Sequence, residues 1–148
     1  MSGTMRTGEP LQRASVVCEA LAWLGTPYHH HARIKGVGVD CAQLLCGVFE
    51  ACGLVEPIDP GVYAVDWHLH RSEEVFSAWC AQYAVPAPEQ PRLGDVWLWK
   101  YGRTFSHGSI YVGDALFVHA YIGRGVIVSR ADEEPLHGRA LQRWSVWP

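Results

Sequence analysis

The order of hydrophobic and polar residues predicts a helical first half. From residue 12 to residue 24 apolar side chains recur at helical spacing, and Gly25 and Pro27 follow as stop signals. A further helix is expected over residues 72–83, with acidic residues suitably placed in its first turn. The apolar positions that predict these two helices are Ala14, Val17, Cys18, Leu21 and Leu24, then Val75, Phe76, Trp79 and Tyr83.

Between these two helices, the stretch from Gly38 to Gly53 predicts a sharp turn that enters a buried helix. Gly38 permits a tight entry, Asp40 is a good N-cap, and Gly53 stands where a C-terminal cap glycine belongs. We expect this helix to run from about Cys41 to about Cys52.

The second half of the chain has the pattern of an antiparallel sheet. After the proline-rich linker 85–91, short runs rich in Val, Ile, Trp, Tyr and Phe alternate with Gly and Asp. Helices first and strands afterwards indicate the α+β class, with N-terminal helices packed on an antiparallel sheet of about five strands. One domain over residues 1–148 is expected, with residues 1–10 flexible. The expected strands are 95–100, 108–112, 116–121, 125–130 and 143–147.

Composition narrows the classes of function. The 148 residues carry 12 basic and 15 acidic side chains, a formal charge of −3, which does not favour nucleic acid as a partner. The five cysteines are odd in number and lack metal-binding spacing, so neither a disulfide scaffold nor a metal or other cofactor is expected. The polar start of the chain does not resemble a signal peptide or a membrane span. We therefore expect synthesis in the cytoplasm and no membrane insertion; if the protein acts outside, something else must carry it there.

Cys41 is the candidate nucleophile. In the first turn of a helix it faces unpaired backbone N–H groups and the positive end of the helix dipole, and both favour the thiolate. The alternative is that Cys41 is a small buried apolar residue, as most free cysteines are. Position decides between the two only if a base lies nearby.

His107 and His119 are the candidates for that base. They flank Gly113-Asp114, the expected hairpin turn, and their numbers are symmetric about Gly113. A loop centred there pairs His107 directly with His119 on one face of the sheet, whereas a two-residue turn leaves the rings on a diagonal. Two adjacent imidazoles suit a base and the residue that orients it.

Two loops contribute further candidates. Residues 26–38 lead into the Cys41 turn and bring Tyr28 near the thiol, while His29, His30 and His31 form a weak candidate metal site and, for at least two of them, a solvated loop is favoured. Residues 54–70 are long, irregular and aromatic, which fits either a lid or a cover for one edge of the core. The polar and aromatic residues of this second loop are Tyr63, Trp67, His68 and His70.

Four motifs in order resemble the NlpC/P60 family of papain-like cysteine peptidases. They are Gly25-Thr26-Pro27-Tyr28, Val39-Asp40-Cys41-Ala42, Gly94-Asp95-Val96, and the run from His107 to Gly113 that continues into Phe117-Val118-His119-Ala120. The resemblance implies a papain-like fold and hydrolysis of peptidoglycan stem or cross-link peptides, commonly between D-γ-glutamyl and a diamino acid. It also implies that Cys41 is the nucleophile, His107 the base and His119 the orienting residue, with Tyr28 and Asp40 near the oxyanion or substrate.

The finer expectations concern the branch of the family and the substrate. The stretch 63–71 and the small size look most like the phage and prophage tail-associated branch, so phage tail proteins are expected partners beside peptidoglycan peptides. The family usually has Ser after the cysteine, often Ser-Gly, where this chain has Ala42-Gln43, which leaves substrate choice open. Two alternatives stand beside the peptidase: a tail assembly component with little or no peptidase activity, and a related Cys/His amidase or acyltransferase.

Overall fold

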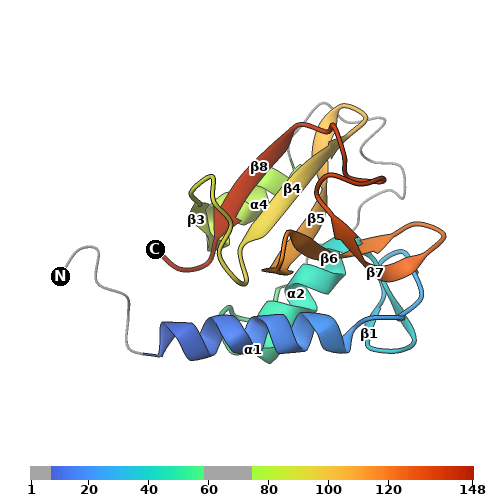
Figure 1. The fold of residues 1–148 in the computed structure, drawn as a ribbon. Coiled ribbons are helices and arrows are strands. Elements are labelled where there is room, and N and C mark those ends of the chain that lie inside the picture. The colour runs from blue at the N-terminus through green and yellow to red at the C-terminus, as the bar shows by residue number, and fades with distance from the viewer. Residues whose placement is uncertain (1–7, 59–74) are drawn as a thin grey trace.

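The computed structural model describes residues 8–58 and 75–148 and has the expected α+β architecture (Figure 1). The lid or cover interpretation of residues 54–70, together with Tyr63, Trp67, His68 and His70, falls largely on residues outside the described ranges. So do residues 1–7 and the expected start of the third helix. The described helices are α1 (Glu9–Ala22), α2 (Cys41–Ala51) and α4 (Val75–Tyr83). The described strands are β1 (Arg33–Ile34), β2 (Gly38–Val39), β3 (Val85–Pro86), β4 (Val96–Tyr101), β5 (Thr104–Gly113), β6 (Leu116–Tyr121), β7 (Gly125–Arg130) and β8 (Leu141–Ser145).

The described strands form an antiparallel main sheet in the order β3-β8-β4-β5-β6-β7, with β1 and β2 as a separate short pair. All five predicted strands are confirmed, and β6 and β7 have the predicted bounds. The sixth, β3, lies in the segment predicted as a proline-rich linker and pairs with β8. Proline can occupy such an edge strand because its missing N–H is not needed there.

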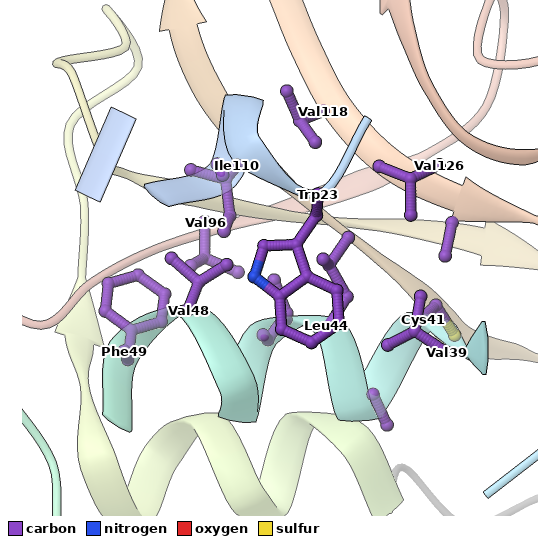
Figure 2. Close-up of a cluster of buried hydrophobic side chains, with 14 of the residues drawn as sticks. Trp23, Val39, Cys41, Leu44, Val48, Phe49, Val96, Ile110, Val118 and Val126 are labelled. Atoms are coloured by element: carbon purple, nitrogen blue, oxygen red, sulfur yellow. The ribbon is translucent and has the colours of Figure 1, made fainter. Parts of the chain in front are cut away.

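One face of the sheet packs against the helices. Side chains of α1, α2 and α4 meet the inward residues of β4 to β7 in one apolar core. Figure 2 shows Cys41 at one end of this core and Phe49 at the other end of α2. The nucleophile candidate therefore lies where the helix start meets the sheet. The sheet residues of this core are Val96, Leu98, Ile110, Val118, Ala120 and Val126.

The opposite face of the sheet carries a second, aromatic cluster. Trp97, Trp99 and Phe117 pack around Leu136, which lies in the segment between β7 and β8 and is fully buried. His107 lies directly opposite Trp99 in the β4–β5 pair, so its side chain belongs to this second face. The sheet thus separates the helical core from the layer that holds the histidine.

The first helix is confirmed, but the apolar positions that predicted it do not mark its buried face. Ala14, Cys18, Leu21 and Leu24 are exposed, and Val17 is half-buried. The buried side is the neighbouring one, which includes charged residues because they pair with each other and with the sheet. Its members are Glu9, Arg13, Val16 and Ala20.

The hairpin between β5 and β6 differs from the expected register by two residues. Its turn is Asp114-Ala115, both with positive φ, and Phe117 lies opposite Tyr111 instead of Ser109. A bulge between Tyr111 and Gly113 accounts for the extra residue. A regular hairpin with this turn would place Tyr111 and Phe117 on opposite faces. The bulge restores them to the same face, and with them His107 and His119.

Within residues 8–58 and 75–148, the structure contains no helix with the length and apolar character that crossing a bilayer requires.

Candidate active site

Cys41 is the first residue of α2, as the sequence predicts. Asp40 is the N-cap, and its Oδ1 accepts a hydrogen bond from the backbone N–H of Gln43 at 2.9 Å. Its Oδ2 accepts another from the backbone N–H of His31 at 2.7 Å, so one buried carboxylate joins the preceding loop to the helix. These two bonds fix the direction in which the helix leaves the loop, and hence the position of the thiol.

The Cys41 sulfur is held against the backbone of β5. The thiol donates to the carbonyl oxygen of Ser106 at 3.5 Å, and the backbone N–H of Gly108 donates to the sulfur. The close approach depends on Gly108: a Cβ there would lie 2.6 Å from Cδ1 of Leu45 and 2.9 Å from Cζ of Phe76. The glycine after His107 therefore allows β5 to lie against α2 and α4.

The thiol is neutral in the resting site. Burial raises the pKa of Cys41 to about 12, and the negative charge of Asp40 acts in the same direction. The backbone N–H groups of Gly108, Ala42 and Cys41 lower this pKa, as expected at a helix start, without reversing the shift. The N–H groups of the helix start thus act in the predicted direction, but loss of solvent outweighs them.

His107 and His119 are brought together by the hairpin. His107 Nε2 lies 2.8 Å from His119 Nδ1, and the two buried rings are nearly perpendicular. Extending the observed register places His119 opposite Ser109, so the two imidazoles lie on a diagonal and not directly opposite each other. Because Cys41 contacts the backbone on both sides of His107, the thiol lies at the strand position that carries the imidazole pair.

Two tyrosines border the His107 ring on the outer face. The ring centroids of Tyr101 and Tyr121 lie 4.9 Å and 5.8 Å from that of His107. Tyr101 is held in place because its hydroxyl donates to the carbonyl oxygen of Pro135 at 2.8 Å and the Arg139 guanidinium lies 3.5 Å above its ring. These rings limit the space into which the His107 imidazole can rotate.

Tyr28 lies beside the helix start, as expected. It forms a bridge with Val39 of β2, two residues before Cys41. Burial raises the pKa of Tyr28, and negative charge at Asp40, or at Cys41 when it is a thiolate, raises it further. The phenol therefore remains protonated at neutral pH and can donate a hydrogen bond.

The three consecutive histidines differ in exposure. His29 and His31 are exposed, as expected for a solvated loop, while His30 is half-buried, with Nδ1 3.8 Å from Oδ2 of Asp40. Among the described residues no group of three or more His, Cys, Asp or Glu side chains is arranged to hold a metal ion.

The two residues after the nucleophile have structural contacts. Ala42 is buried and lines an apolar cavity between α2, α4 and β4. Gln43 accepts a hydrogen bond from Nε of Arg33 at 2.7 Å, and Arg33 also pairs with Glu50 farther along α2. The missing hydroxyl after Cys41 is thus replaced by an apolar contact.

Sequence reasoning missed Ser129. This buried serine on β7 lies with its Oγ 2.7 Å from Nε2 of His119. Burial lowers the pKa of His119 to about 4, and the charge of Arg124 contributes, so the ring is neutral at physiological pH. The only available signal was a serine directly after the apolar run Val126-Ile127-Val128, and it carries meaning only once β7 is paired with β6.

The lowered pKa of His119 predicts acid sensitivity. Between pH 6.5, the ordinary value, and pH 4, the unfolded chain takes up a proton at this residue while the folded one does not. The free energy of unfolding should therefore fall as the pH drops through this range, by about 3 kcal/mol from this residue. Urea unfolding of the wild type and of His119→Asn at several pH values measures the effect. In His119→Asn the free energy of unfolding should depend less steeply on pH, whereas substitution of the exposed His137 should leave the wild-type dependence unchanged. An equal pH dependence in wild type and His119→Asn would contradict the assignment.

Helices on one face of an antiparallel sheet, with a cysteine at a helix start beside a histidine-bearing strand, define the papain-like fold. The model described as "NlpC/P60 family" matches residues 25–145. The chain belongs to the NlpC/P60 family.

Several solved structures are similar to this chain. One is the NlpC/p60 domain of the peptidoglycan hydrolase SagA, with a TM-score of 0.57 and 21% identity, covering 88% of this chain and 96% of that one. Another is the peptidoglycan hydrolase RipB from Mycobacterium tuberculosis, with a TM-score of 0.64, 18% identity, and coverage of 99% and 70%. A third is an NlpC/P60 family protein from Bacillus cereus, with a TM-score of 0.63 and 16% identity, where the match covers 92% of this chain but 40% of that one.

No curated protein matches the chain significantly. None of the three names above mentions a phage tail, so the tail-associated branch remains a prediction.

Proposed function

We propose that this protein is a cysteine peptidase that hydrolyses stem or cross-link peptides of peptidoglycan. The observation that carries the proposal is the 2.8 Å contact between His107 and His119. His107 lies on β5, the strand whose backbone bonds the Cys41 sulfur. Membership of the NlpC/P60 family supports it, as do two similar structures that are named peptidoglycan hydrolases.

The proposed roles follow from which ring atoms are already engaged. His107 bonds His119 through Nε2, so Nδ1 is the atom that takes the thiol proton. Since the resting thiol is neutral, we propose that its proton moves to His107 as the sulfur attacks the peptide carbonyl. His107 then gives that proton to the leaving amine, and a thioester remains on Cys41. Water, activated by the same imidazole, hydrolyses the thioester and restores the thiol.

Two donors are proposed for the oxyanion of the tetrahedral intermediate. One is the backbone N–H of Cys41 at the start of α2, and the other is the hydroxyl of Tyr28. Each such donor typically lowers the barrier by about 3 kcal/mol. Asp40 has both oxygens engaged by backbone N–H groups, which supports a role in shaping the site.

The expected scissile bond lies between D-γ-glutamyl and a diamino acid. The test is digestion of peptidoglycan fragments from several wall types, followed by mass spectrometry and measurement of new amino groups, with Cys41→Ala prepared in the same way as the control for contaminating hydrolases. Cleavage at this bond gives one product that ends in D-glutamate and another that begins with the diamino acid. Products cut elsewhere would correct the bond. No release from any wall type would contradict the peptidase and favour the tail assembly alternative or an acyl-transfer enzyme.

A further inference from the structure

Ser129 lies at the end of the hydrogen-bonded chain that runs from His107 through His119. In the β6–β7 pair it is opposite Phe117, two residues from His119 on the same face, so the serine and the imidazole are diagonal neighbours. The contact between Ser129 Oγ and His119 Nε2 is 2.7 Å, and both side chains are buried. A short contact between two buried polar groups restricts the orientation of both.

We infer that Ser129 is a positioning residue that accepts a hydrogen bond from His119 and thereby keeps the imidazole pair in the productive tautomer. The inference rests on the proposed function, since the tautomer is defined by what His107 must do for Cys41.

The direction of the chain follows from the number of protons. A neutral imidazole carries one ring N–H. If His107 is to accept a proton on Nδ1, its own proton is on Nε2 and is donated to Nδ1 of His119. His119 must then carry its proton on Nε2 and donate it to Oγ of Ser129.

The reverse direction would disable the base. If the Ser129 hydroxyl donated to His119, the His119 proton would sit on Nδ1 and point at Nε2 of His107. The His107 proton would then be on Nδ1, the atom that must receive the thiol proton. Removing the hydroxyl leaves Nε2–H of His119 without its buried acceptor, which favours this disabled arrangement.

The direct test reads the histidine tautomers without substrate. Two-bond ¹H–¹⁵N spectra of the uniformly labelled protein should show His107 and His119 both protonated on Nε2, with assignments from the His107→Gln and His119→Asn variants. In Ser129→Ala, His119 should be protonated on Nδ1 or show a mixture of the two tautomers. Ser129→Thr, which keeps the hydroxyl, should retain His119 protonated on Nε2. A wild-type spectrum with His119 protonated on Nδ1 would overturn the inference, even if no Ser129 variant folds.

Kinetics provide the second readout. Ser129→Ala should lower kcat about fivefold with KM unchanged, the effect of one hydrogen bond between neutral groups, and Ser129→Thr should restore it. Ser145→Ala is the matched control, because Ser145 is also buried and hydrogen-bonded but its partner is Trp147. It should lower stability while leaving the tautomers and kcat unchanged. Equal losses of kcat in both alanine variants would reduce Ser129 to a structural residue. Because the spectra need no turnover, failure of the proposed peptidase activity can be told apart from failure of this inference.

Discussion

Replacing Cys41 with alanine should abolish the release of new amino groups from peptidoglycan fragments. The thiol is the only group we assign to bond formation with the substrate, and removal of a nucleophile typically lowers kcat by about 10⁴-fold or more. The measurement is the initial rate of amine release at saturating substrate. The fold should persist because alanine fits the space of the thiol and the cap by Asp40 is unchanged.

A second cysteine provides the control for this variant. Cys18 lies exposed on α1 and takes no part in the site, so Cys18→Ala should retain full activity. If Cys41→Ala kept more than about a hundredth of the wild-type rate, a role for this thiol as the nucleophile would be untenable.

Removal of the Asp95 carboxylate should cost about 3 kcal/mol of the free energy of unfolding. Asp95 is fully buried; its Oδ1 accepts from Nη1 of Arg13 at 3.0 Å and its Oδ2 from the backbone N–H of Arg92 at 3.0 Å. Asp95→Ala leaves the buried guanidinium of Arg13 with Glu9 as its remaining carboxylate, at 2.8 Å. We expect a loss at the lower end of the range that is usual for breaking a buried ion pair, because Glu9 still pairs with Arg13.

Urea unfolding at neutral pH measures this loss of stability. An exposed ion pair of the same chain serves as the control. Asp132 bonds Arg130 at 3.0 Å on the exposed surface, so Asp132→Ala should not change stability measurably. If Asp95→Ala and Asp132→Ala unfolded at the same urea concentration, the buried network would not stabilise the fold as we argue.

The helix that carries the nucleophile could be predicted because its signals are local. The Asp40 cap, the start at Cys41 and the glycine at its end all lie within one short stretch, and the structure confirms them. The α+β class could also be predicted, because the change from helical to alternating periodicity is visible along the chain. The buried face of α1 could not be predicted in this way, because Arg13 pairs there with Asp95, which lies far along the sequence.

The candidate site could be predicted only in part for a similar reason. His107 and His119 were found from their symmetry about a turn, yet the register of their two strands depends on a bulge that the sequence does not predict. The pKa of the Cys41 thiol depends on how closely β5 packs against α2, and this packing is decided by Gly108. Ser129 required knowledge of how β7 pairs with β6. Each of these features arises from contacts between segments that are distant in sequence.

The distance along the chain between the nucleophile and the base has a consequence for biosynthesis. Cys41 leaves the ribosome long before His107, His119 and Ser129 have been translated, and these residues meet only when the hairpin strands have assembled against α2. No nascent fragment that ends before β7 contains the whole machinery. Under the proposed function, hydrolytic competence is therefore acquired as a late step of chain maturation.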